Sequence, residues 1–139
     1  MPAAPAAPAE ETTAADFLYT CVDTPAAMES LMAELRGVTR LAVDTETTSS
    51  RPMQAELVGI SLAWKPGQAV YLPVKGPLGS TVLDVDDVRR ALGPVLADPK
   101  VAKVGQNLKY DWIVLHNAGF RLAGRLFDTM IAAHVLDSG

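Results

Sequence analysis

The sequence predicts an α/β domain in which helices flank a mixed β-sheet. Three observations lead to this prediction. Short runs rich in β-branched and aromatic residues alternate with longer segments in which apolar residues recur at helical spacing. About half of the 139 residues are hydrophobic, which is enough to bury a core. A helical pattern also separates the last two strand-like runs, and helical crossovers of this kind connect parallel strands.

The strand-like runs are bounded by turn residues. The expected strands span 17–22, 40–45, 56–64, 69–74 and 100–104. The sequence Lys65-Pro66-Gly67-Gln68 favours a turn, so the strands on either side of it should form a hairpin. Residues 121–122 are expected to form a further brief extended piece.

Helix boundaries are indicated by capping residues. The expected helices span 25–36, 84–97, 107–117 and 129–136. Thr24 caps the first helix ahead of Pro25, and Asp84 caps the second, which must stop before Pro99. Asp128 is interpreted as the cap of the last helix. This order of elements, in which a hairpin is followed by helix, strand and helix, is typical of a ribonuclease H-like fold.

Composition limits the kinds of partner. The net charge is −4, so the chain lacks the basic surface that drives tight binding to duplex nucleic acid. A nucleic-acid ligand would be held through metal ions and a few local contacts, or with the help of another domain. Residues 1–15 are expected to be a disordered Ala/Pro-rich linker, and residues 16–139 the folded part. With no signal peptide and no membrane-spanning run, a soluble cytoplasmic protein is expected.

The chain has a single cysteine, Cys21, which excludes an internal disulfide and a cysteine-based zinc site. Cys21 lies in an apolar strand-like run, so we expect a buried thiol without a chemical role.

Two carboxylates stand at the end of a hydrophobic strand. Asp44 and Glu46 are two residues apart, so they should point to the same face of the sheet. Ligands bind at the carboxyl ends of strands in open α/β sheets, and oxygen ligands suit Mg²⁺ or Mn²⁺. An acidic, solvated turn after a strand would look the same, so both interpretations are open on this pair alone.

A third carboxylate, Asp111, lies on or beside the apolar stripe of its helix, between Leu108 and Leu115. A charge at this position is costly unless it is paired or binds a metal, although an edge position that reaches water is the alternative. Asn107 lies one turn earlier and can cap the helix, face the same site, or do both. Asp128 could also lie near the metals instead of only capping.

The chain from about residue 16 onward resembles the proofreading 3′→5′ exonuclease domain of bacterial DNA polymerase I, within the DEDD superfamily. Asp44-Thr45-Glu46-Thr47 is similar to the first motif, and Val-Gly-Gln-Asn-Leu-Lys-Tyr-Asp, residues 104–111, to the second. The segments 57–61, 66–67, 71–74 and 127–130 match in the same order and spacing. The eight-residue string is much more specific than an isolated Asp-x-Glu.

The resemblance implies a two-metal phosphodiesterase. Asp44, Glu46 and Asp111 would hold two Mg²⁺ or Mn²⁺ ions, and a 5′-nucleoside monophosphate would leave from a 3′ end. Gln106 and Asn107 would support the site, and the turn 47–51, beginning at Thr47, would lie near the terminal nucleotide. A single-stranded DNA 3′ end would be the substrate. A linked polymerase domain would hold the duplex, and the N-terminal linker resembles the tether from a 5′-nuclease domain.

The family has a third motif, Tyr-x-x-x-Asp, which should follow the 127–128 segment. No tyrosine follows Tyr110, and Asp137 is preceded at the required spacing by Ala133. His134 is three residues before Asp137 and does not supply a histidine version of the motif. We therefore expect one metal site to be incomplete and this chain to be inactive or weak alone.

Two other functions remain open at this point. A ribonuclease D-like RNA 3′ exonuclease shares the carboxylates, and a vestigial domain would only brace a polymerase. The 105–111 string and the hairpin at 66–67 favour the polymerase relative.

Overall fold

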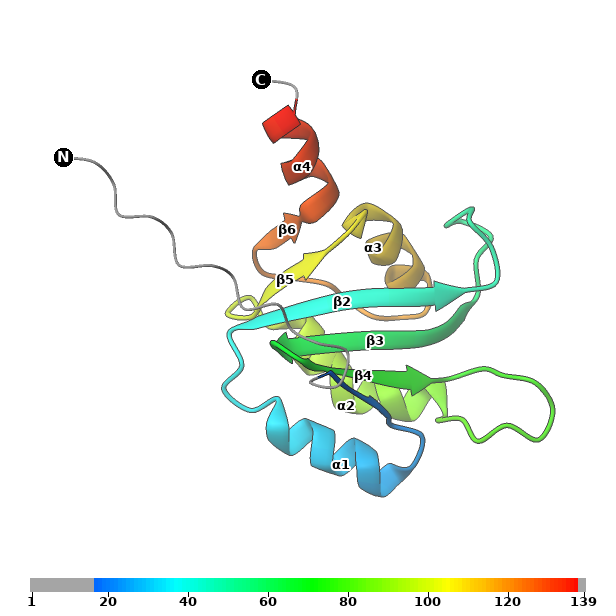
Figure 1. Ribbon diagram of the computed structural model, residues 1–139. Helices are drawn as coiled ribbons and strands as arrows, with labels where there is room; N and C mark the ends of the chain where they lie inside the picture. The colour runs from blue at the N-terminus through cyan, green and yellow to red at the C-terminus, as the bar shows by residue number, and fades with distance from the viewer. Residues whose placement is uncertain (1–16, 138–139) are drawn as a thin grey trace.

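The computed structural model describes residues 17–137, which form a six-stranded mixed sheet and four helices (Figure 1). This confirms the predicted α/β class. In chain order the elements are β1 (Leu18–Cys21), α1 (Pro25–Glu34), β2 (Arg40–Thr47), β3 (Leu57–Lys65), β4 (Gln68–Pro73), α2 (Val85–Ala97), β5 (Ala102–Gly105), α3 (Leu108–Asn117), β6 (Leu126–Asp128) and α4 (Thr129–Asp137).

The strands are ordered β1-β4-β3-β2-β5-β6 across the sheet. β2, β3 and β4 form an antiparallel meander, which confirms the predicted hairpin. β5 pairs in parallel with β2, as the helical crossover predicts, and β6 and β1 pair in parallel with their neighbours. The first motif in β2 therefore lies beside β5, the strand in which the second motif begins, although about sixty residues separate them along the chain.

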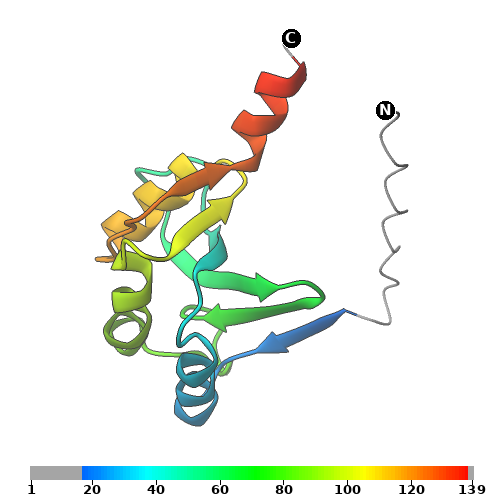
Figure 2. The same cartoon turned by 90° about the vertical axis from the view of Figure 1, so that its left-hand side faces the viewer.

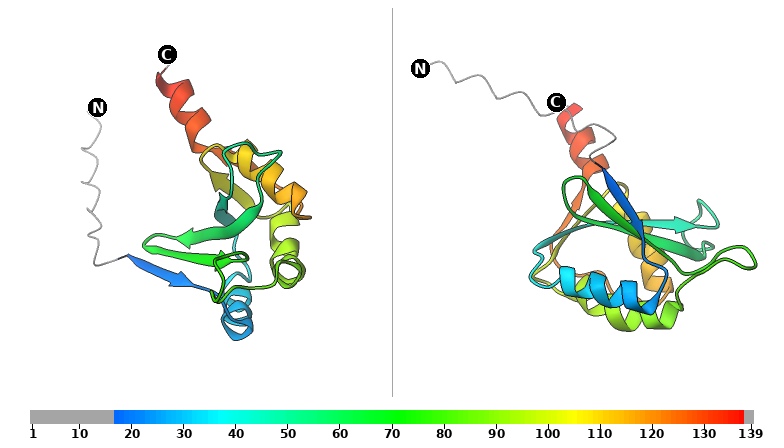
Figure 3. Two further views of the ribbon diagram at one scale, coloured as in Figure 1. Left: turned by 90° about the vertical axis from the view of Figure 1, so that its right-hand side faces the viewer. Right: turned by 60° about the horizontal axis from the view of Figure 1, so that its bottom comes forward.

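Helices α1, α2 and α3 lie on one side of the sheet, and α4 projects beyond its edge (Figures 2 and 3). The core forms between this side and the helices. Its centre consists of Leu41, Val43, Ile60, Leu62 and Leu72 from the strands and Val88, Leu92, Leu96 and Leu115 from the helices. No helix of the described residues covers the opposite face of the sheet, which we call the open face.

The helices begin where their capping residues predict. The Thr24 hydroxyl accepts a hydrogen bond from the Ala27 amide at 3.1 Å. Asp84 Oδ1 accepts from the amides of Asp86 and Asp87 at 2.9 and 3.2 Å. α2 ends at Ala97, before Pro99, as expected. None of the helices between residues 17 and 137 is long and apolar enough to span a membrane.

Two sequence-based expectations are wrong. The extended piece after α3 is β6, Leu126–Asp128, and not residues 121–122, because Leu122 turns into the core and the chain reaches β5 only beyond Gly124. Cys21 is exposed, because it lies in the edge strand β1, whose four residues all reach solvent.

A buried charge that the sequence did not reveal lies under β5. Lys103 has no exposed surface, and its ammonium group donates hydrogen bonds to the carbonyls of Asp98 at 2.8 Å and Ala123 at 2.6 Å. Burial lowers the pKa of Lys103, although Asp98 opposes this. The lysine joins the turn that precedes β5 to the turn that precedes β6, and so it fixes the start of the strand that leads to the second motif.

Candidate active site

β2 alternates between the core and the open face. Leu41, Val43 and Thr45 are buried against the helices, whereas Asp44 and Glu46 are exposed. The prediction that the two carboxylates share one face is thus confirmed, and that face is the open one. Across the sheet, Asp44 is paired with Ser61 and Glu46 with Gly59.

Asp111 lies in the first turn of α3 and is only 2 % exposed. Its Oδ1 accepts hydrogen bonds from the Thr45 amide at 3.0 Å and from the Thr45 hydroxyl at 2.5 Å. The second motif is therefore tied to the strand residue that lies between the two carboxylates of the first motif. Of the two interpretations left open by the sequence, the structure supports a buried carboxylate and not an edge position that reaches solvent.

The surroundings of Asp111 act on its charge in opposite directions. Burial raises the pKa of Asp111, the hydrogen bonds from Thr45 lower it, and the charge of Asp44 raises it again. The net direction is upward. The charge of Asp44 thus acts on Asp111, and a bound cation relieves repulsion of this kind.

The chemical type of the ligand atoms at the candidate site suits a divalent ion. The predicted ligands Asp44, Glu46 and Asp111 offer only carboxylate oxygens, the ligands that Mg²⁺ and Mn²⁺ prefer. No three His, Cys, Asp or Glu side chains within residues 17–137 are close enough together to form a ready-made ion site. The structure bonds Asp111 to Thr45, the chain neighbour of both Asp44 and Glu46, and it places Asp44 and Glu46 on one face.

Asp128 has a larger role than the sequence suggested. It accepts hydrogen bonds from the amides of Met130 and Ile131 at 2.9 and 3.4 Å, so it caps α4 as predicted. It also accepts from the amides of Asn107 and Leu108 at 3.1 and 2.7 Å, so it caps α3 as well. Burial raises the pKa of Asp128, but these four backbone hydrogen bonds outweigh it and hold the pKa below its ordinary value.

Asn107 does not cap α3 through its side chain, contrary to one of its two expected roles. Its backbone is left-handed, with φ of 55°, and no hydrogen bond joins its side chain to the first turn. Asp128 accepts the hydrogen bonds that cap the helix instead, so the exposed side chain of Asn107 takes no part in capping. An asparagine tolerates this backbone better than most residues do.

Gly105 allows the start of the second motif, at the end of β5, to lie close to β2. A Cβ at this position would lie 2.8 Å from the Leu108 side chain and 3.0 Å from the Val43 carbonyl oxygen. A side chain at this position would displace the buried Leu108 side chain and press on the β2 backbone, which glycine avoids.

The turn after β2 is fastened to α3 by Tyr110, a residue that the motif reasoning left without a role. Its hydroxyl donates to the Ser49 carbonyl at 2.5 Å and is in hydrogen-bond contact with the Thr47 hydroxyl. Thr47 also donates to the Ser49 carbonyl, at 2.9 Å. Thr47 thus lies beside the second motif. Thr45 was likewise missed, although strand alternation placed it on the inner face.

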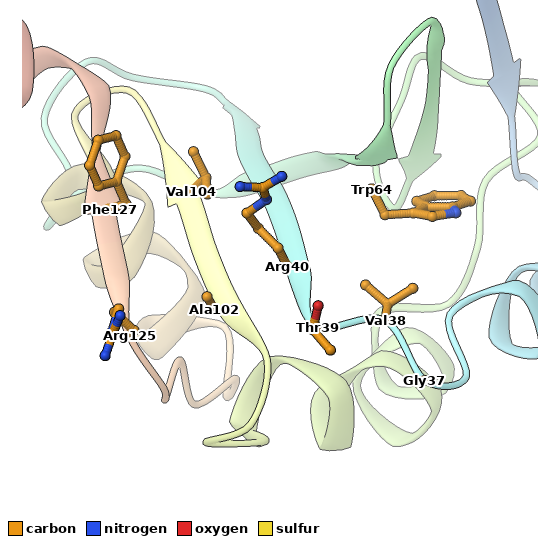
Figure 4. A pocket seen from close by; sticks show the side chains of 9 residues that line it. All are labelled: Gly37, Val38, Thr39, Arg40, Trp64, Ala102, Val104, Arg125 and Phe127. Carbon is orange, nitrogen blue, oxygen red and sulfur yellow. The ribbon is translucent and has the colours of Figure 1, made fainter.

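Two hollows lie on the open face. One, of about 410 Å³, contains Asp44 and Gln106 among small side chains such as Ala42, Ala63 and Ala69. The other, of about 800 Å³, lies toward the beginning of β2 and is shown in Figure 4. It is lined by Arg40, Trp64, Val104, Arg125 and Phe127, among others, and contains none of the predicted site residues. The larger volume therefore does not mark the candidate site.

The sheet order and the helices on one face define a nuclease fold of the ribonuclease H-like class, a fold shared with ribonuclease D of Escherichia coli. That structure superimposes with a TM-score of 0.64 at 26 % identity, over 84 % of this chain and 28 % of that one. The chain belongs to the 3′-5′ exonuclease family, whose model matches residues 19–139.

The family assignment is supported by DNA polymerase I sequences. The chain is 42 % identical to DNA polymerase I of Pseudomonas aeruginosa over 134 residues, which is 94 % of this chain and 15 % of that protein. It is 41 % identical to DNA polymerase I of Chloroflexus aurantiacus over 117 residues, 84 % of this chain and 12 % of that protein. These matches confirm the resemblance inferred from the two motifs.

Proposed function

We propose that this chain removes nucleotides from single-stranded 3′ ends of DNA, as the proofreading domain of a polymerase I-type protein. The observation that carries the proposal is the contact between Asp111 and Thr45. It brings a buried carboxylate from α3 to the part of β2 that carries Asp44 and Glu46. Membership of the 3′-5′ exonuclease family supports the same activity.

Asp44, Glu46 and Asp111 would hold two divalent ions, Mg²⁺ or Mn²⁺. When bound, such ions supply an activated water and stabilise the charge that develops on the phosphate. The chain's own contribution is the placement of the carboxylates: β2 presents two of them on the open face, and Thr45 holds the third.

Substrate contacts are assigned to residues around the carboxylates. Gln106 shares a hollow with Asp44, and the side chain of Asn107 is free of capping duty. Thr47 is the last residue of β2, beside the turn that Tyr110 fixes. These three polar side chains would grip the terminal nucleotide locally, which suits a chain with a net charge of −4. A linked polymerase domain would supply the grip on the duplex, and a 5′-nuclease domain could precede residues 1–15.

The test is a titration of Mn²⁺ into the chain, followed by NMR, with and without deoxythymidine monophosphate. We expect selective broadening of resonances around Asp44, Glu46 and Asp111 that the nucleotide strengthens. Asp44→Ala is the comparison and should abolish the effect. Broadening that is uniform, or that persists in Asp44→Ala, would count against a metal site at these carboxylates.

An RNA 3′ exonuclease is the second candidate, because the E. coli ribonuclease D fold superimposes on most of this chain. Single-stranded DNA and RNA of equal sequence separate the two functions, and we expect DNA to be the better substrate. The weakness of this chain acting alone stays a prediction. Strong metal-dependent cleavage that Asp111→Ala abolishes would refute it, while no cleavage by the intact parent protein would indicate a vestigial domain.

A further inference from the structure

Thr45 is buried although both of its neighbours in the chain are exposed acids. It is 7 % exposed and faces α3, on the side of β2 opposite to Asp44 and Glu46. Both of its hydrogen-bond donors, the amide and the hydroxyl, end on the same atom, Asp111 Oδ1. The contact spans 66 positions in the sequence, so it joins the first motif to the second.

A threonine suits this contact for two physical reasons. Its β-branched side chain is stiff about χ1 and fits a strand, so the hydroxyl is held in one direction. A buried hydroxyl and a buried carboxylate each need a partner, and a charge-assisted hydrogen bond satisfies both at once. Valine has nearly the same shape but no donor. Serine keeps the donor and loses only a methyl group.

The hydroxyl is what fixes the rotation of the carboxylate. The amide of Thr45 alone gives one hydrogen bond, about which the carboxylate can turn. The hydroxyl, as a second donor on the same oxygen, restricts this turn and strengthens the difference between the two oxygens of Asp111. Oδ1 is occupied by Thr45, which leaves Oδ2 for a ligand.

The position of α3 itself does not depend on Thr45. Asp128 caps the helix from the other side, through the amides of Asn107 and Leu108. Leu108, Val114 and Leu115 are buried in the interior. The loss of the hydroxyl should therefore free the carboxylate and leave the helix in place.

We infer that Thr45 is a positioning residue that orients the Asp111 carboxylate, so that Oδ2 is the oxygen presented to a divalent ion. The part of this inference that concerns the ion rests on the proposed function. The part that concerns orientation rests on the two hydrogen bonds alone.

The experiment compares Thr45→Val with Thr45→Ser. Partners of a metal ligand typically contribute about 10- to 100-fold to metal affinity. We expect Thr45→Val to weaken Mn²⁺ binding by about 10-fold, whereas Thr45→Ser stays within about 2-fold of the unmodified chain. Ile60→Val is the matched control, because Ile60 is the cross-strand partner of Thr45 and its change loosens packing without removing a hydrogen bond. It should leave Mn²⁺ affinity unchanged.

Equal weakening by Thr45→Val and Ile60→Val, or by Thr45→Val and Thr45→Ser, would overturn the inference. Two further measurements, made in EDTA, do not depend on metal binding, and the first of them does not use Thr45→Val. In the unmodified chain the Thr45 amide should be protected from hydrogen exchange and should lose protection in Asp111→Ala. In the second, the NMR chemical shift of the Asp111 carboxyl carbon should change in Thr45→Val and stay close to that of the unmodified chain in Thr45→Ser. An unprotected amide, or a shift indifferent to the hydroxyl, would also overturn it. Absence of Mn²⁺ binding in the unmodified chain counts against the proposed function only.

Discussion

Gly124 combines a left-handed backbone with three close carbonyl oxygens, and its replacement by alanine tests how β6 is held. Its φ is +92°, a region that residues with a Cβ rarely adopt. A Cβ there would lie 2.5 Å from the Val101 carbonyl oxygen, 3.1 Å from that of Pro99 and 3.2 Å from that of Asp98. Backbone oxygens cannot swing aside as a side chain can.

The expected loss has two parts. Placing a residue with a Cβ in a left-handed conformation costs about 1–2 kcal/mol. Forcing an extra carbon into a filled space costs about 1–3 kcal/mol more. Gly124→Ala should therefore lower the free energy of unfolding by roughly 2–5 kcal/mol, a large fraction of the 5–15 kcal/mol typical of domains.

Urea unfolding, followed by circular dichroism, measures this loss. Gly79→Ala is the matched control, because Gly79 has a φ of +86° and no atom within 4 Å of the added Cβ. Gly79→Ala therefore has the conformational cost of a left-handed backbone but no steric clash. The effect of alanine on the entropy of the unfolded chain is the same in both variants and cancels in the comparison. We expect Gly124→Ala to lose about 1–3 kcal/mol more than Gly79→Ala. Equal losses would refute the argument that the carbonyls around Gly124 limit this turn.

Three further predictions concern the carboxylates. Burial raises the pKa of Asp111 in the folded chain above its unfolded value of about 3.9. The folded chain therefore binds the Asp111 proton more tightly than the unfolded chain does. The stability this gives is fully present below about pH 3.9 and is lost as the pH rises through the pKa of the folded chain. In EDTA, Asp111→Asn should therefore gain free energy of unfolding relative to the unmodified chain as the pH rises above about 4. A difference that does not vary with pH would contradict this. Asp84→Ala should lose about 1 kcal/mol in urea unfolding, because Asp84 caps one helix. Asp128→Ala should lose about twice as much as Asp84→Ala, since Asp128 caps two helices, and similar losses would show that one of its caps contributes nothing.

Much of the fold could be predicted because the local signals agree with the tertiary structure. Capping residues and helical periodicity placed α1, α2 and α3 within a few residues, and alternation placed Asp44 and Glu46 on one face. β6 was not predicted because a strand of three residues is too short to show an alternating pattern. Its position is set by pairing with β5. The exposure of Cys21 escaped because an apolar run does not reveal that its strand lies at a sheet edge.

The contacts that organise the candidate site were harder to predict, because they join distant segments. Asp111 could be placed on an apolar stripe, but nothing local identifies Thr45 as its partner. Asn107 looked like a cap because its type and position are right for one. A carboxylate twenty-one residues later takes that role. The burial of Lys103 was hard to predict for the same reason, because the two carbonyls that accept its hydrogen bonds come from separate turns.

The alternation along β2 has a consequence for how such a domain could change under selection. The residues that stabilise the sheet face inward, and the two exposed acids contribute nothing to the core. Substitutions at exposed positions usually change stability by less than about 0.5 kcal/mol. Substitution of Asp44 or Glu46 by genetic drift would therefore abolish the proposed chemistry without loss of folding. An inactive descendant would have an unchanged free energy of unfolding. Only an assay of nuclease activity, or the identity of these two residues, would reveal the loss.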